Sequence, residues 1–348
     1  MTQPAIGIDI GGTKIAGALV APDGTILERS RVSTPTDSTD EIVAATGGVV
    51  TELVAAAGDR GVLGVGLACA AFVDGARGHV WFAPNLPWRD VELADRVAQV
   101  VGLPVVLEND ANAAAWGEYV FGAGRDVDDM VLLTLGTGVG GGCVSKGNLL
   151  TGAFGIAGEL GHVVLDPDGP RCGCGNKGCL EVYASGTALT RNARELVTSA
   201  SPIGEALRER CGGDPEVLRG TDVTELAQEG DLAAVELLEE VATRLGHGIA
   251  SICAVLDPRL VVIGGGVSAA GDLILDPVRR AFVRNQIGRG HRPSPQIVLA
   301  ELGNDAGVVG AAHRAMVLLG DADPEGDGSA HGESDRRSDR RSDGGSGA

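Results

Sequence analysis

A compact cysteine cluster near the middle of the chain constrains the fold most strongly. Cys172, Cys174 and Cys179 lie within eight positions, and His162 precedes the first of them by ten. Thiolates and imidazole are the ligands that zinc prefers, and four of them complete a closed tetrahedral site with no open position for water. The spacing therefore predicts a structural zinc site, which would also fix the flanking residues Glu159 and Glu181.

The composition indicates an acidic globular protein of two domains. The chain has 348 residues, of which 44% are hydrophobic, so a sizeable core is available. Its formal net charge is -19, and the part expected to fold has no long basic patch, which argues against nucleic acid as a partner.

The N-terminus and the other cysteines indicate the cellular compartment of the protein. No signal peptide is visible, and no apolar run reaches the roughly 18 residues that a membrane span needs. The remaining cysteines are scattered along the chain, which is typical of a reducing compartment. We therefore expect a cytoplasmic protein that does not contact a membrane.

Short apolar runs alternate with helix-like segments, which is typical of an α/β fold. Strands are expected at 6–10, 15–20, 26–32, 62–68, 105–107, 131–135, 140–145, 260–263 and 297–300, and helices at 38–57, 91–100, 112–119, 231–256 and 306–319. Residues 321–348 are rich in Asp, Ser, Gly and Arg and contain little to bury, so they are predicted to be a disordered tail.

One pattern of strand, glycine-threonine turn and strand occurs twice, about 125 residues apart. The first turn is Gly11-Gly12-Thr13-Lys14, and the second is Gly136-Thr137-Gly138. A single copy would fit an ordinary hairpin equally well, but two copies can hold phosphate oxygens from two sides through backbone N–H groups and a hydroxyl. Asp9, at the end of the first strand, could hold Mg²⁺ through water. The repeat predicts two related halves that face each other.

Asp110 occupies a position that allows two roles. It lies between a predicted strand and a predicted helix, where a side chain can project into a cleft. Spacing alone favours another role, because an aspartate before Ala111 can cap the helix that follows.

Several motifs together resemble the ROK family, and in particular its bacterial glucokinases. The resemblance covers about residues 5–320 and depends most on the cysteine segment with Glu159-Leu-Gly-His162 before it. The motifs, in order, are Asp9-Ile-Gly-Gly-Thr-Lys14, Glu108-Asn-Asp-Ala-Asn112, Leu135-Gly-Thr-Gly-Val-Gly-Gly-Gly142, Glu159-Leu-Gly-His162 and Cys172-Gly-Cys-Gly-Asn-Lys-Gly-Cys-Leu-Glu181.

The resemblance implies a two-domain actin-like, ribonuclease-H-like fold with a cleft between the domains. Residues 1–112 with 305–320 would form the smaller domain, and residues 113–304 the larger domain with the zinc loop. ATP with Mg²⁺ would bind on both turns, at Asp9, Gly11, Gly12, Thr13, Lys14, Gly136, Thr137 and Gly138, with Gly264, Gly265 and Gly266 near its adenosine. Family members are commonly dimers or tetramers, so a homodimer or homotetramer is expected.

The resemblance also implies a reaction, which is transfer of the ATP γ-phosphate to the 6-hydroxyl of glucose with Asp110 as the base. Sugar contacts would come from Asn85, Asn109, Asp110, Glu159, His162 and Glu181. His162 would ligate zinc through one ring nitrogen and donate to a sugar hydroxyl through the other. Alternatives are a kinase for another hexose, polyphosphate as the donor, and a sugar-responsive regulator. A regulator would need a helix-turn-helix domain before Asp9, where the sequence leaves no room for one.

One departure from the family pattern concerns the strand predicted at 62–68. Many members carry a Pro-Gly pair after it, whereas this chain has Cys69-Ala70-Ala71-Phe72. This difference leaves the shape of one cleft wall, and with it the sugar preference, open.

Overall fold

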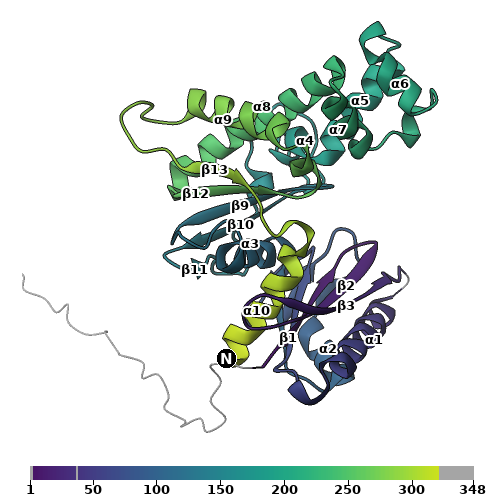
Figure 1. The fold of residues 1–348 in the computed structure, drawn as a ribbon, viewed down its shortest axis with the longest axis vertical. Coiled ribbons are helices and arrows are strands. Elements are labelled where there is room, and N and C mark those ends of the chain that lie inside the picture. Colours follow the sequence, from purple (N-terminus) through teal and green to yellow (C-terminus); the bar gives the residue numbers. More distant parts are fainter. Residues whose placement is uncertain (1–2, 37, 321–348) are drawn as a thin grey trace, which may run out of the picture.

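The computed structural model of the chain describes residues 3–36 and 38–320 (Figure 1). The predicted tail at 321–348 lies outside the described residues. The ribbon has two lobes, each built on a five-stranded sheet, with helices α3 (Asp110–Phe121) and α10 (Ala306–Gly320) side by side near their junction.

The two sheets have the same topology. The first has the order β3-β2-β1-β4-β8, and the second the order β11-β10-β9-β12-β13. In each sheet the first three strands are antiparallel, and the last two add in parallel. The prediction of two related halves is confirmed, as is the α/β, two-domain actin-like fold class. The strands are β1 (Ala5–Ile10), β2 (Lys14–Val20), β3 (Ile26–Ser33), β4 (Val65–Cys69), β8 (Val105–Asn109), β9 (Met130–Leu135), β10 (Val139–Ser145), β11 (Asn148–Leu149), β12 (Leu260–Gly264) and β13 (Gln296–Leu299).

A third, smaller sheet was not predicted. It consists of β5 (Phe72–Asp74), β6 (His79–Phe82) and β7 (Arg89–Val91), which pair in antiparallel order between β4 and β8 in the sequence. These strands have three or four residues each, too few to show a period of two. The predicted helix at 91–100 begins only after β7, as α2 (Leu93–Val101).

Helices fill the connections, and local capping explains where several of them begin. The Ser38 side chain accepts a hydrogen bond from the Glu41 amide at the start of α1 (Thr39–Ala57), as predicted. Asp231 caps α8 (Leu232–Leu256) through the Ala234 amide. The other long helices after the cysteine segment are α5 (Gly186–Thr198), α7 (Gly220–Glu229) and α9 (Asp272–Asn285). The short helix α4 (Glu181–Ala184) precedes α5, and the short helix α6 (Glu205–Arg210) lies between α5 and α7.

Helix α1 corrects one sequence expectation. Among the described residues, the segment 39–60 is long and apolar enough to cross a membrane by length and composition alone. In the fold its buried residues Ile42, Val50 and Leu53 belong to the core of the first sheet, with Ile8 and Leu19. The apolar character of this helix is therefore accounted for by packing.

Helix α10 packs on the first sheet although it comes last in the sequence. Glycines allow the close approach: a Cβ at Gly7 would lie 1.8 Å from the Val308 carbonyl oxygen, and one at Gly66 would lie 1.9 Å from that of Ala311. The same helix crosses α3, where a Cβ at Gly310 would lie 1.8 Å from the Ala113 carbonyl oxygen. These contacts fix the start of α3 relative to the first sheet.

Candidate active site

The first glycine-threonine turn joins β1 to β2 and is braced by Thr34. The Gly11 amide donates to the Lys14 carbonyl (3.0 Å), and the Thr34 hydroxyl donates to the Gly11 carbonyl (2.7 Å). Gly12, Thr13 and Lys14 are exposed. The turn therefore presents its backbone and the Thr13 hydroxyl at the surface, as a phosphate site requires.

The second turn is held against the start of α5. The Gly136 carbonyl accepts from the Gly186 amide (2.8 Å), and the Thr137 carbonyl accepts from the Thr187 hydroxyl (2.6 Å). The segment at 264–266 packs closely on Leu135, at the end of β9. Gly265, whose φ is +82°, leaves no room for a side chain there, since a Cβ would lie 2.6 Å from the Leu135 amide nitrogen. Both predicted glycine segments thus meet at one place.

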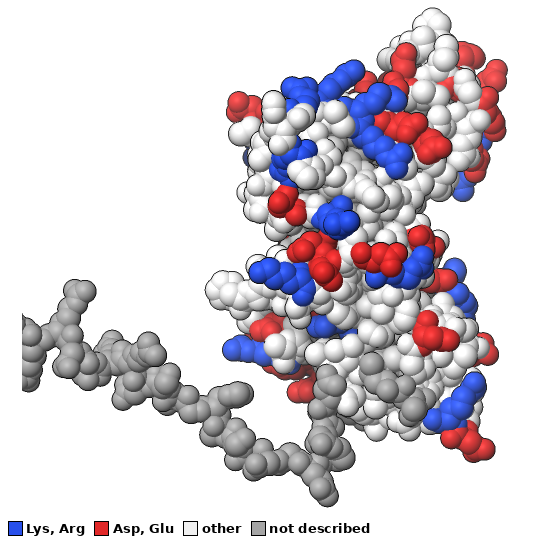
Figure 2. Space-filling model, turned by 60° about the vertical axis from the view of Figure 1, so that its left-hand side comes forward, with Lys and Arg blue, Asp and Glu red and all other residues white. Residues whose placement is uncertain are grey.

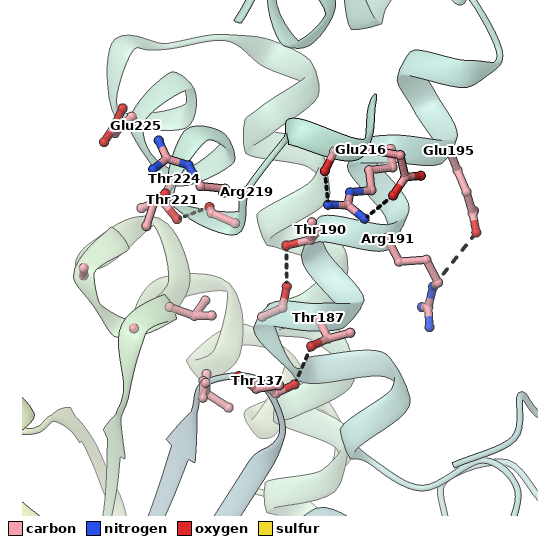
Figure 3. A pocket seen from close by; sticks show the side chains of 18 of the residues that line it. Thr137, Thr187, Thr190, Arg191, Glu195, Glu216, Arg219, Thr221, Thr224 and Glu225 are labelled. Carbon is pink, nitrogen blue, oxygen red and sulfur yellow. Dashed lines mark hydrogen bonds and ion pairs between the residues drawn. The ribbon is translucent and has the colours of Figure 1, made fainter. Parts of the chain in front are cut away.

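A cavity of about 1380 Å³ opens beside this second turn. Of the predicted nucleotide residues, Gly136, Thr137 and Gly266 line it. The others do not, namely Asp9, Gly11, Gly12, Thr13 and Lys14 of the first half and Gly138, Gly264 and Gly265 of the second. Figure 3 shows Thr187 beside Thr137 at the bottom of the view, with the side chains of α5 and α7 above them. The sequence analysis missed these lining residues, which include Thr187, Thr190, Arg191, Thr221 and Thr224.

Asp110 is the first residue of α3, and its neighbour provides the cap. The Asn109 side-chain oxygen accepts from the amides of Ala111 (2.9 Å) and Asn112 (3.0 Å). The cap interpretation of Asp110 is therefore wrong, because the adjacent asparagine takes this role and the helix begins two residues earlier than predicted. Burial raises the pKa of Asp110, and the Ala111 amide opposes this. The helix start does not depend on the Asp110 carboxylate, because Asn109 caps it.

Four carboxylates converge around this position. Burial and the charge of Asp110 raise the pKa of Asp9 to about 6, with Lys14 opposing the shift. Burial and the charges of Asp110 and Glu181 raise the pKa of Glu159 to about 7. Repulsion between carboxylates requires that they lie near one another. Asp9 of β1, Asp110 of α3, Glu159 before His162 and Glu181 of α4 therefore share one site.

The cysteine segment is folded as a zinc site would require. The ligand atoms of His162, Cys172, Cys174 and Cys179 all lie within 4.8 Å of one another. Two of these separations are 3.6 Å, from the Cys172 Sγ to the His162 Nδ1, and 3.7 Å, from the Cys174 Sγ to the Cys179 Sγ. Tetrahedral zinc with bonds of about 2.0–2.3 Å needs edges of this size, so the four residues fit the metal.

Both bracketing carboxylates touch this segment. The His162 Nε2, on the far side of the ring from Nδ1, lies 4.0 Å from a Glu159 oxygen. Glu181 accepts from the Cys172 thiol (3.4 Å) with one oxygen and from the Val139 amide (3.1 Å) with the other. Glu181 therefore connects the cysteine segment to the strand that follows the second turn.

The two predicted asparagines contact different parts of the site. Asn85 is exposed in the turn between β6 and β7, and a Cβ at Gly12 would lie 3.5 Å from its Cβ. Asn109 donates its side-chain amide to the Ala71 carbonyl (3.2 Å). Asn112, which was not predicted, is buried and donates to Glu108 (3.1 Å), whose other oxygen lies 3.5 Å from Arg314 of α10.

Comparison with known proteins identifies the family. A model of the ROK family matches residues 5–316. The chain is 43% identical over 310 residues to a glucokinase of Streptomyces coelicolor, and the match covers 89% of this chain and 96% of the relative. It is 39% identical to a glucokinase of Halalkalibacterium halodurans, with a match that covers 88% of this chain and 92% of the relative. Its structure is similar to the crystal structure of a ROK family glucokinase from Streptomyces griseus in complex with glucose and AMPPNP, with a TM-score of 0.83, 45% identity, and coverage of 90% of this chain and 99% of that one. The chain belongs to the ROK family.

Proposed function

We propose that the protein is a glucokinase that transfers the γ-phosphoryl group of ATP to the 6-hydroxyl of glucose. The observation that carries the proposal is the convergence of Asp110 with Asp9 and Glu159 at the point where the two turn-bearing halves meet. Fold alone would not support a specific activity. The similarity to proteins named glucokinases, one of them solved with glucose and AMPPNP, agrees with the chemistry of the site.

Asp110 is proposed as the general base. As the sugar oxygen attacks the γ-phosphorus, the bond from phosphorus to the bridging oxygen breaks, ADP leaves, and the hydroxyl proton passes to the Asp110 carboxylate. The two turns would hold the phosphates, and Asn85, Asn109, Glu159, His162 and Glu181 would bind the other sugar hydroxyls. Mg²⁺, held through water by Asp9, would neutralise phosphate charge.

Zinc has a positioning role in this proposal. His162, Cys172, Cys174 and Cys179 would occupy all four of its coordination positions, so zinc supplies rigidity and takes no part in phosphoryl transfer. With Nδ1 on the metal, the His162 Nε2 remains available beside Glu159. The metal thus fixes the orientation of three proposed sugar ligands.

ATP is proposed as the donor in preference to polyphosphate because of the charges around the cavity. Its lining includes three arginines and three glutamates, namely Arg191, Arg194, Arg219, Glu195, Glu216 and Glu225. Arg194 already bonds Glu216 (3.1 Å), and Arg219 bonds Asp222 (2.9 Å). A long polyanion needs a surplus of positive charge along its path, whereas a nucleoside fits a cavity of balanced charge.

Four further features of the protein are proposals from the sequence. We propose a cytoplasmic protein, and the seven free cysteines agree with a reducing compartment.

We propose a homodimer or homotetramer. We also propose that the protein binds neither nucleic acid nor membrane, and the interspersed basic and acidic side chains on the face in Figure 2 agree with this. We propose domains of 1–112 with 305–320 and of 113–304, because α10 packs on the first sheet.

A coupled assay over a panel of hexoses, each with ATP and with polyphosphate, tests the function. We expect the highest kcat/KM for glucose with ATP. A higher value for another hexose would support the alternative substrate, which the Cys69-Ala70-Ala71 segment leaves open. Turnover with none of the hexoses would contradict a kinase function.

A further inference from the structure

The small sheet of β5, β6 and β7 touches three separate parts of the active site. Its β6–β7 turn approaches Gly12 of the first phosphate turn through Asn85. The segment entering β5 accepts a hydrogen bond from Asn109 at the Ala71 carbonyl. Strand β5 also meets the loop before Glu159, where a Cβ at Gly155 would lie 2.2 Å from the Val73 carbonyl oxygen. The sheet is therefore a wall of the site.

Asn85 lies at the tip of this wall, in a six-residue turn at 83–88 that needs support from outside its own strands. β6 and β7 pair at only two positions, Val80 with Val91 and Phe82 with Arg89. The Ala83 amide also donates to the Trp88 carbonyl (3.1 Å) and closes the turn across its ends. Asn85 lies between these ends and beyond the strand pairing, so its position depends on further contacts.

Arg89 supplies these contacts. Its Nη1 donates to the carbonyl oxygens of Trp88 (2.6 Å), Ala83 (2.8 Å) and Leu86 (3.3 Å), which surround Asn85 on both sides in the sequence. Its guanidinium carbon lies 4.0 Å from the centre of the Phe82 ring, close enough for a cation–π interaction. A single side chain thus binds carbonyls on both sides of the turn and packs on the strand before it.

His79 lies at the base of the same hairpin, between two carboxylates. Its two ring nitrogens lie 3.0 Å from Asp90 and 3.1 Å from Glu92. Asp90, directly after Arg89, has a φ of +57°, in the left-handed region that aspartate adopts more readily than most residues. The chain therefore changes direction directly after Arg89.

We propose that Arg89 is a positioning residue for sugar binding: it holds the 83–88 turn so that Asn85 faces the sugar over the first phosphate turn. The inference rests on the proposed sugar kinase function. Arg89 itself bonds backbone carbonyls of the turn and acts through Asn85. Its effect should consequently fall on the sugar and leave phosphoryl transfer and nucleotide binding nearly unchanged.

The test is a double-mutant cycle between Arg89→Met and Asn85→Ala, measured as KM for glucose, KM for ATP, and kcat. We expect R89M to raise the glucose KM about ten- to hundredfold, because displacing a binding group by an ångström has an effect of this size. The kcat and the ATP KM should stay within about twofold. In the N85A background, R89M should add little, since both changes remove one interaction.

Two further variants complete the design. R89K should recover part of the glucose affinity, because lysine can donate to the carbonyls but lacks the planar group that stacks on Phe82. R77M is the matched control: Arg77 precedes the same hairpin, its side chain is 73% exposed, and its ion pair is a 3.6 Å contact with Asp74. It should leave the glucose KM unchanged.

The outcomes separate the two proposals. Multiplicative effects of R89M and N85A on the glucose KM, or an equal loss in the ATP KM and kcat, would overturn the role of Arg89. An unmutated protein that phosphorylates no hexose would instead overturn the proposed function. Thermal unfolding of each variant shows whether a raised KM reflects a displaced turn in a folded protein.

Discussion

The two sheets share one strand order but carry different insertions. The first sheet accepts the small β5–β7 sheet between β4 and β8, whereas the second accepts the zinc segment and helices α4–α8 between β11 and β12. The common part supplies one glycine-threonine turn from each half. The first insertion supplies one proposed sugar contact, Asn85, whereas the second supplies Glu159, His162 and Glu181 together with α5 and α7, which line the large cavity. The repeated core is thus common to both halves, and most of the proposed binding residues lie in the insertions.

Asp110→Asn should have the largest effect, because it removes the proposed base at the junction of the two halves. We expect kcat to fall roughly 10²- to 10⁴-fold, with glucose binding still measurable by calorimetry. Because Asn109 caps α3, the helix should remain intact. Normal turnover in this variant would disprove the assignment of the base.

Cys172→Ser tests the insertion of the second half. Metal analysis should find about one zinc per chain in the unmutated protein and much less in the variant. The glucose KM should rise roughly tenfold or more, and the melting temperature should fall, because Glu159, His162 and Glu181 lose their support. Cys211→Ser is the control, since Cys211 is a buried cysteine directly after α6 and does not belong to the group of His162, Cys172, Cys174 and Cys179. A metal-free protein with an unchanged glucose KM would rule out this role for zinc.

One glycine from each turn should respond differently to substitution by alanine. A Cβ at Gly138 would lie 2.3 Å from a Glu181 oxygen, whereas one at Gly12 would approach no atom more closely than 3.5 Å. Gly138→Ala should therefore displace Glu181 and raise the glucose KM about tenfold, and Gly12→Ala should have a smaller effect, confined to ATP. Equal effects on the glucose KM would show that the turns are interchangeable.

The pH dependence of kcat/KM should reflect the acidic junction between the halves. Burial raises the pKa of Asp110 above its ordinary value of 3.8. The base must be ionised to accept a proton, so activity should be lost as the pH falls through this raised pKa. The acid limb should lie above the usual aspartate range and disappear in the residual activity of D110N. Full activity at pH of about 4 would contradict the argument.

Deletion of residues 321–348, which belong to neither half, should have the smallest effect. Their composition predicts no part in the core. We expect kcat, both KM values and the melting temperature to be unchanged. A large fall in any of them would assign the tail a function.

Much of the fold and part of the site could be predicted from the sequence. The residues within each glycine-threonine turn are adjacent in sequence, and the four proposed zinc ligands lie within 18 positions, so each motif could be recognised locally. The small sheet could not be predicted, because strands as short as Arg89–Val91 show no periodicity. The cavity residues of α5 and α7 come together only through tertiary packing. The predicted cap, Asp110, is one residue away from the observed cap, Asn109. Both residue types cap well, so propensity does not distinguish the two positions.

The late position of α10 has a consequence for synthesis of the chain. This helix covers β1 and β4, yet some 240 residues separate β4 from it, so the first sheet waits on the order of tens of seconds during translation for its covering helix. The half that leaves the ribosome first is thus completed last. Ribosome-bound chains stopped before residue 306 should expose the apolar face of that sheet and depend on chaperones, whereas chains that include α10 should not.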